Sequence, residues 1–90
     1  MSRLIDILKQ KGWNGHEDVN TETCSGYKGD ISIVKDRYDL TITVNGLDVI
    51  SEFTFLISDI ILFDISDEEV ELETSGGISL KVPIVEKKNV

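Results

Sequence analysis

The side chains best suited to metal binding or catalysis are a histidine, two carboxylates and the chain's single cysteine. His16, Glu17 and Asp18 are consecutive, and Cys24 follows six residues after Asp18. Such side chains can bind a transition metal, and a thiol beside an imidazole can act as a nucleophile. The pattern fits neither role, because zinc sites use paired Cys or His and no oxyanion-stabilising motif accompanies Cys24. We therefore expect no metal, no cofactor and no catalytic residue.

A second group of residues could contact a ligand or anchor a partner. Its members are aromatic or basic: Trp13, Tyr27, Lys28, Arg37 and Tyr38. Tyr27 and Lys28 lie in SGYKG, which does not match a phosphate-binding loop but could contact a small anion. Arg37 and Tyr38 lie in DRYD at an expected hairpin turn, and both residue types are favoured at interfaces. Trp13 follows an expected helix, so it either staples the helix to the sheet or anchors a partner.

Charge is the strongest functional signal, and it is unevenly distributed. The net charge is −8, and residues 38–80 hold ten acids and no base. Residues 1–37 are neutral overall, and the last ten residues carry +2. Such a field repels nucleic acid and favours basic partners. We therefore expect a basic protein partner and no direct contact with nucleic acid, although solubility alone also benefits from a charge of this size.

Length and composition indicate one small domain. Ninety residues with 40% hydrophobic content can form one core, and the longest purely apolar run, 60–63, is too short to span a membrane. We expect no signal peptide, because the N-terminus has no apolar h-region. One cysteine cannot form an internal disulfide, and together these features favour the cytoplasm. A core this small also favours a homo-oligomer.

The elements that position these residues can be read from the apolar pattern. Residues 3–11 are predicted to form a helix, with Ser2 as its N-cap and Gly12 in the left-handed position after its end. Three apolar residues form its stripe: Leu4, Ile5 and Leu8. The glycine-bearing segment 12–29 shows no clean period and is predicted to be a long loop.

Residues 30–84 are predicted to form an antiparallel sheet, because apolar and polar residues alternate along them. Asn45-Gly46 is the pair typical of a two-residue type I′ turn. Closure there would pair Val44 with Leu47. It would also set Asp39 opposite Glu52 on the outer face. The next segment, 60–65, is apolar on both faces, which is typical of a strand covered on two sides.

The register of the last two strands follows from which of their residues must point to the same face of the sheet. A three-residue loop at 75–77 keeps the apolar residues of both strands on one face, whereas a two-residue turn would not. This loop pairs Leu72 with Leu80 and ends in a glycine suited to left-handed backbone. Glu71 then lies opposite Lys81, the one outward base of the strand. Pro83 indicates an edge strand, and residues 85–90 are a predicted tail.

The predicted fold class is therefore α+β, with a short N-terminal helix followed by about six antiparallel strands in a bent meander or small barrel. This order resembles the Sm-like barrel in topology, and the stretch VELETSGGISLKVPI resembles its late strands. The chain carries no Sm signature, so the resemblance implies nothing about RNA. Small acidic chains without catalytic motifs also resemble phage-encoded inhibitors of host defence systems.

The outward acids of the predicted strands are the candidate protein-binding residues. They are Asp39, Asp48, Glu52, Glu69, Glu71 and Glu73. Facing like charges weaken a sheet, so a basic partner would compensate for the repulsion. We expect a non-enzymatic acidic module that docks on a basic protein surface, in one form a phage-type inhibitor of a defence or nucleic-acid-binding protein. The alternatives are a small-ligand-binding or sequestering oligomer and a structural or assembly protein.

Overall fold

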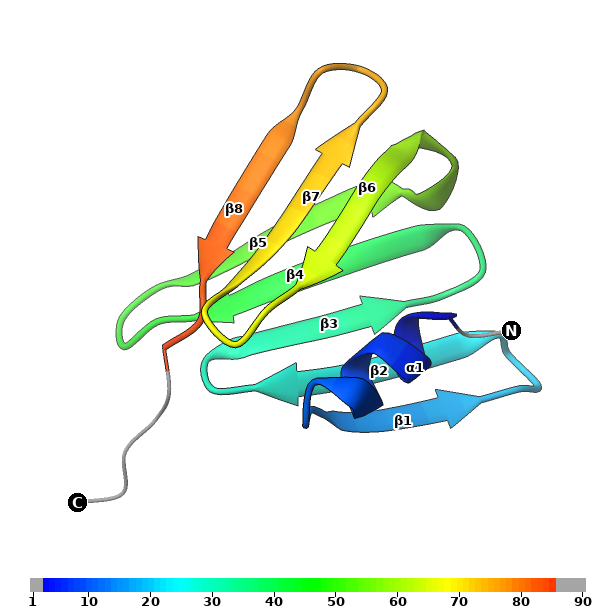
Figure 1. Ribbon diagram of the computed structural model, residues 1–90, viewed down its shortest axis with the longest axis horizontal. Coiled ribbons are helices and arrows are strands. Elements are labelled where there is room, and N and C mark those ends of the chain that lie inside the picture. Colours follow the sequence, from blue (N-terminus) through cyan, green and yellow to red (C-terminus); the bar gives the residue numbers. More distant parts are fainter. Residues whose placement is uncertain (1–2, 86–90) are drawn as a thin grey trace.

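A computed structural model describes residues 3–85 as two antiparallel sheets and a short helix (Figure 1). The elements are α1 (Arg3–Gln10), β1 (Asn14–Asp18), β2 (Thr23–Lys28), β3 (Ile31–Lys35), β4 (Asp39–Asn45), β5 (Ile50–Leu56), the 3-10 turn η1 (Ile57–Asp59), β6 (Ile60–Ile65), β7 (Glu69–Thr74) and β8 (Ser79–Pro83). Sheet A has the strand order β1-β2-β3-β4-β5, and sheet B has the order β6-β7-β8. No helix in this part of the chain is long and apolar enough to cross a bilayer.

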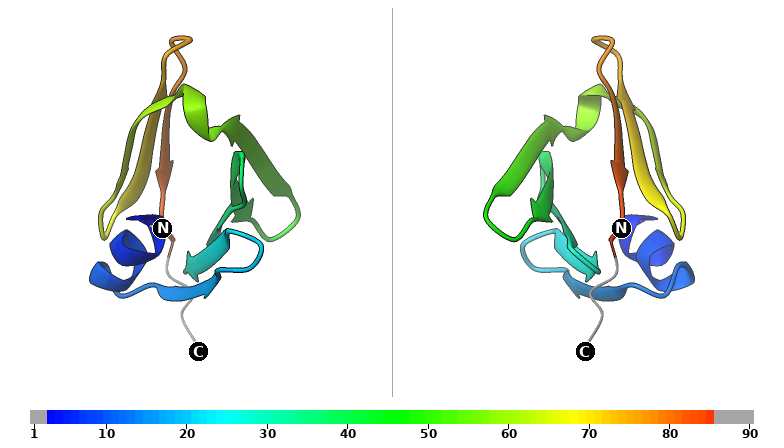
Figure 2. Two further views of the ribbon diagram at one scale, coloured as in Figure 1. Left: turned by 90° about the vertical axis from the view of Figure 1, so that its right-hand side faces the viewer. Right: turned by 90° about the vertical axis from the view of Figure 1, so that its left-hand side faces the viewer.

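The two sheets pack through one face each, and α1 completes the inner layer. Figure 2 shows sheet B and α1 side by side on the same face of sheet A. Buried side chains from all three units form one core: Leu8, Ile31, Ile33, Leu40, Ile42, Ile65, Val70, Leu72 and Val82. The face of each sheet turned away from this core is called its outer face below. The outer faces of sheets A and B therefore point away from each other.

The antiparallel α+β architecture is confirmed, but the number of strands and the barrel alternative are not. There are eight strands within residues 3–85, and sheets A and B share no ladder, so no closed barrel forms. The fold therefore lacks the closed sheet that a likeness to an Sm-like barrel would require. The reason lies at η1, which ends β5 and turns the chain into the other layer instead of letting it pair again with β5 (Figure 2).

The helix ends as the sequence predicts, within one residue. Gly12 has a φ of 77°, which is the left-handed conformation that glycine adopts without a steric cost. The Gly12 N–H donates to Lys9 O (3.2 Å) and the Trp13 N–H donates to Leu8 O (2.8 Å), which is a Schellman arrangement. Trp13 follows directly and is buried beside Leu8 in the core. Ser2 and the side chains of Leu4 and Ile5 lie outside the described residues.

The prediction of a long loop at residues 12–29 is wrong. This segment forms the β1–β2 hairpin, with Asn14 opposite Tyr27 and Asp18 opposite Thr23. The apolar pattern missed it because β1 is polar and exposed at every position. On the inner face of β2 the space beside Gly26 is filled by Leu8 of α1. This position therefore holds a glycine, and the apolar side chain that would have indicated a strand is absent from the sequence.

The hairpin of β4 and β5 is confirmed, but its predicted turn is wrong. Asn45 pairs with Ile50, so residues 46–49 form a four-residue loop, closed by a bond from Gly46 N to Val49 O (2.9 Å). Asn45 is held in the ladder because its backbone N–H donates to Asp30 O (2.7 Å). The register therefore shifts by four residues, which leaves the inward and outward alternation intact. Leu47, which the two-residue turn would have paired with Val44 on the inner face, is exposed, and so is Val49, which that turn would have paired with Ile42.

Sheet B matches the prediction closely in its second hairpin. Leu72 pairs with Leu80 and Glu71 pairs with Lys81. Gly77, at the end of the loop 75–77, has a φ of 93°. β8 is an edge strand, as Pro83 indicated.

Two expectations for sheet B are wrong. β6 is also an edge strand, and its residues Ile61 and Leu62 are exposed where a bulge interrupts the ladder, so β6 is not covered on both sides. Ile78 directly follows the loop 75–77, and although the alternation with Leu80 predicts an inward position for it, it is exposed.

Asp30, in the β2–β3 turn, holds Val85, which follows β8. Its backbone N–H donates to Val85 O (3.1 Å), and its Oδ1 accepts from Val85 N (3.0 Å). One residue earlier, Ile84 N donates to Glu68 O (2.8 Å) in the β6–β7 turn. These bonds tie the end of β8 to both sheets and set the orientation of sheet B. The rest of the predicted tail, 86–90, lies outside the described residues.

Candidate functional site

The six candidate acids do not share one surface. Three of them project from β7 on the outer face of sheet B: Glu69, Glu71 and Glu73. Asp39 and Glu52 belong to the outer face of sheet A, and Asp48 lies in the β4–β5 loop. Because the two outer faces point in opposite directions (Figure 2), one partner surface cannot contact both sets.

The predicted contact between Asp39 and Glu52 is absent. The shifted register places Asp39 opposite Leu56 and Glu52 opposite Thr43. The two carboxylates are separated by the Thr41–Thr54 pair, whose hydroxyl oxygens are 3.1 Å apart. The outer face of sheet A is therefore rich in hydroxyl groups and carries dispersed charge.

Negative charge is concentrated on the outer face of sheet B. Its acidic face is defined here as Asp64, Glu69, Glu71 and Glu73. Asp64 of β6 lies directly opposite Glu71, so two carboxylates share one cross-strand position. On the other side of Glu71 is Lys81, whose Nζ is 3.8 Å from Glu71 Oε2. Lys81 is the one base of this face among the described residues, and the long contact at an exposed position neutralises little of the field.

Asp64 is the residue that sequence reasoning missed. The apolar residues on both sides of it in IILFDI concealed which face it occupies. The signal that could have found it is the turn that follows. A two-residue turn at Asp67-Glu68 pairs Ser66 with Glu69, which in turn sets Asp64 opposite Glu71.

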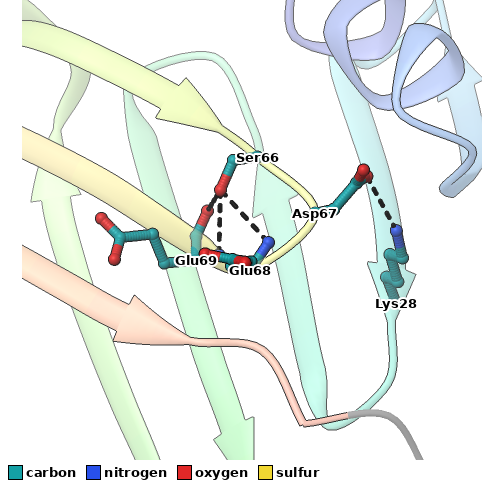
Figure 3. A network of polar contacts seen from close by, with 5 residues as sticks. All are labelled: Lys28, Ser66, Asp67, Glu68 and Glu69. Atoms are coloured by element: carbon teal, nitrogen blue, oxygen red, sulfur yellow. Dashed lines mark hydrogen bonds and ion pairs between the residues drawn. The ribbon is translucent and has the colours of Figure 1, made fainter.

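A serine builds the turn that positions the acidic face (Figure 3). Ser66 Oγ lies 3.2 Å from the backbone nitrogen of Glu68 and 3.1 Å from that of Glu69, and it accepts from both N–H groups. Ser66 N also donates to Glu69 O (2.9 Å). Serine stabilises such turns because its hydroxyl can bond nearby backbone groups. The turn places two more carboxylates, Asp67 and Glu68, at the tip of the hairpin.

One of these tip carboxylates is tied to sheet A. Lys28 Nζ is 3.5 Å from Asp67 Oδ1, and Figure 3 shows the lysine reaching the tip from β2. The lysine side chain is half-buried, whereas Asp67 is exposed. Lys28, a candidate anion contact in the sequence, is therefore engaged by an acid of its own chain.

The remaining candidate anchors do not converge on one site. Trp13 is 5% exposed and belongs to the core, so it staples the helix and is not a surface anchor. Tyr27 is exposed on the outer face of sheet A, and Tyr38 is exposed in the β3–β4 turn. Arg37 of the same turn is paired with Glu22, with 3.4 Å between Nε and Oε2.

Asp36 shapes the turn that carries Arg37 and Tyr38. Its Oδ1 accepts from the backbone N–H groups of Asp39 (3.0 Å) and Tyr38 (3.1 Å). These two bonds lower the pKa of Asp36, because they stabilise the charged carboxylate. The hairpin predicted at DRYD is thus confirmed, and its turn is held by a side chain of its own sequence.

His16 and Cys24 do not form a reactive pair. His16 lies opposite Ser25 on the outer face of sheet A, whereas Cys24 is buried on the inner face, opposite Glu17. Within residues 3–85 no group of three or more His, Cys, Asp and Glu side chains is arranged to hold a metal ion.

Comparisons with protein-family models, with curated proteins and with solved structures found no match. The geometry of the acidic face is the feature of the molecule that points to a function. Exposed carboxylates on a regular strand attract ammonium and guanidinium groups, and this attraction extends over about 8 Å at physiological ionic strength.

Proposed function

We propose that this protein is a non-enzymatic binding module whose acidic face docks on a basic protein surface. The observation that carries the proposal is the direct opposition of Asp64 and Glu71 beside Glu69 and Glu73. Like charges opposite one another cost a sheet roughly 0.2–1 kcal/mol. Such repulsion does not help the chain to fold, and cationic groups of a partner would relieve it.

The spacing of the acidic face suits a repetitive basic surface. Alternate residues of one strand are about 7 Å apart, so Glu69, Glu71 and Glu73 form a regular row on β7. A nucleic-acid-binding protein is the partner class that this row favours, because its own ligand is also a regular row of negative charges. Docking there would block the nucleic-acid site, and the protein would act as an inhibitor.

The experiment is a quantitative pull-down with three matched baits from an extract of the source organism. The baits are the wild type, the double variant Glu69→Lys/Glu73→Lys and the double variant Asp39→Lys/Asp48→Lys. Both variants change the net charge equally, but only the first alters the acidic face. We expect mass spectrometry to find a basic protein that the wild type and the Asp39/Asp48 bait retain and the Glu69/Glu73 bait loses. Equal retention by all three baits would contradict the proposal.

A further inference from the structure

The edge of β5 presents unpaired backbone groups. Within residues 3–85, β5 pairs with β4 and with no strand on its other side. Two hydrogen bonds between the strands show which residues of β5 bond to β4: Gly46 N to Val49 O (2.9 Å) and Ile57 N to Tyr38 O (2.8 Å). Odd-numbered residues of this strand therefore face β4, and even-numbered residues point their N–H and C=O groups outward. A seven-residue row of this kind is a template for another strand.

The other three edges are protected. On β8, even-numbered residues face β7, so the missing N–H of Pro83 lies on the open side, next to Lys81. On β6 a bulge interrupts the strand, and the Ile65 N–H is bonded to Asp64 Oδ1 (3.0 Å). β1 is short and polar along its length. These are devices with which natural sheets avoid edge pairing, and β5 has no proline, no lysine and no bulge.

The side chains of β5 also favour association. Glu52 is its one charged residue, although the surrounding segment 38–80 holds ten acids and no base. Ile50 and Leu56, at the two ends of the strand, are 69% and 53% exposed. The strand thus combines an open backbone edge with apolar side chains that water still contacts.

We propose that a second copy of this chain pairs with the β5 edge, antiparallel and with Phe53 at the two-fold axis. Only even-numbered residues can exchange hydrogen bonds across this edge, which restricts the register. Centring on Phe53 pairs all seven residues and sets Glu52 opposite Thr54 of the second copy. It also sets Ile50 opposite Leu56 of the second copy, so both exposed apolar residues are covered.

The neighbouring registers are less favourable. Centring on Glu52 would place the two Glu52 carboxylates directly opposite each other. Centring on Thr54 would leave Ile50 without a partner. The arrangement around Phe53 is isologous and joins two five-stranded sheets into one continuous sheet. The acidic face stays free in this dimer, because it lies on sheet B, so the inference is independent of the proposed function.

The test is sedimentation equilibrium of the wild type and of two variants at one position, Thr54→Lys and Thr54→Glu. In the proposed register residue 54 faces Glu52 of the second copy, twice in each dimer. Both variants lose the contact of Thr54 with Thr41 Oγ1 equally. We expect the dimer dissociation constant of Thr54→Lys to be about tenfold lower than that of Thr54→Glu. Urea unfolding at low protein concentration checks that both variants fold.

Hydrogen exchange provides the second measurement. On concentration of the wild type, we expect the amides of Ile50, Glu52, Thr54 and Leu56 to gain protection, while those of Ser51, Phe53 and Phe55 stay protected throughout. A wild type that remains monomeric at high micromolar concentration would overturn the proposal. So would equal dissociation constants for the two variants, or a dimer without protection of the even-numbered amides. Protection of those amides only upon addition of another protein would also overturn it and would assign the edge to a foreign strand.

Discussion

Asp64 and Glu71 lie directly opposite each other in the β6–β7 ladder, and both project from the outer face of sheet B. Lys81 lies on the far side of Glu71 and does not separate the two carboxylates. The isolated protein therefore holds a like-charge pair at the centre of its most acidic surface. A partner that supplies cations there would stabilise the complex and the fold together.

Removing one charge of this pair should stabilise the unbound protein. We expect Asp64→Asn to raise the free energy of unfolding by about 0.5 kcal/mol, because the cross-strand repulsion disappears. The amide oxygen can still accept from Ile65 N, as the carboxylate does in the structure. Urea unfolding measures the change. Asp48→Asn, which removes one negative charge from a loop, is the control and should have almost no effect; a destabilised Asp64→Asn would argue against repulsion between Asp64 and Glu71.

Gly26 should be intolerant of any side chain. A Cβ at this position would lie 2.6 Å from Leu8 Cδ1 and 2.8 Å from the backbone oxygen of Asn14. Either α1 or β1 must then move, so we expect Gly26→Ala to destabilise the fold by about 1–3 kcal/mol in urea unfolding. Gly76→Ala is the matched control, because the nearest atom to a Cβ there is Thr74 Oγ1 at 3.8 Å. Similar losses for both variants would show that α1 does not pack on β2 as described.

The Asp36 turn should make stability depend on pH in acid. The pKa of Asp36 is lowered in the folded state by bonds from the Asp39 and Tyr38 N–H groups. A depressed carboxyl pKa contributes stability above the unfolded-state pKa, which is about 3.9 for Asp, and this stability is lost as pH falls through the folded-state pKa. Asp36→Asn keeps an acceptor oxygen but removes the charge. We expect the wild type to be more stable than Asp36→Asn at pH 7, with a difference that shrinks below about pH 4. A stability difference between the two proteins that stays constant down to pH 2.5 would show that it does not arise from the charge of Asp36.

The sequence predicted sheet B best because two signals agreed there. Apolar alternation in 70–72 and 80–82 and the glycines at 76–77 permit only one register, and that register is observed. At Asn45-Gly46 one strong local signal was misleading. Asn45 is drawn into the ladder by Asp30, a tertiary contact that no local pattern reveals.

The remaining errors have the same physical origin. The β1–β2 hairpin is stabilised by α1 packing against a glycine, so its strands lack the apolar pattern that alternation requires. The six candidate acids were predicted only because they alternate with apolar residues and so point outward. This alternation does not say which sheet a strand joins. The division of these acids between two opposite faces, and the addition of Asp64, required the three-dimensional arrangement of both sheets.

Docking through the acidic face is tested most sharply by the affinity of the basic partner for this face at two salt concentrations. Isothermal titration calorimetry would compare the wild type, Glu69→Lys/Glu73→Lys and Asp39→Lys/Asp48→Lys against the protein recovered in the pull-down. We expect the Glu69/Glu73 variant to bind at least about tenfold more weakly than the wild type, because like charges would then meet across the interface. The Asp39/Asp48 variant should bind as the wild type does, and wild-type binding should weaken as salt screens the attraction. Equal affinities for both double variants, or wild-type affinity that salt does not change, would show that the partner does not dock on the acidic face.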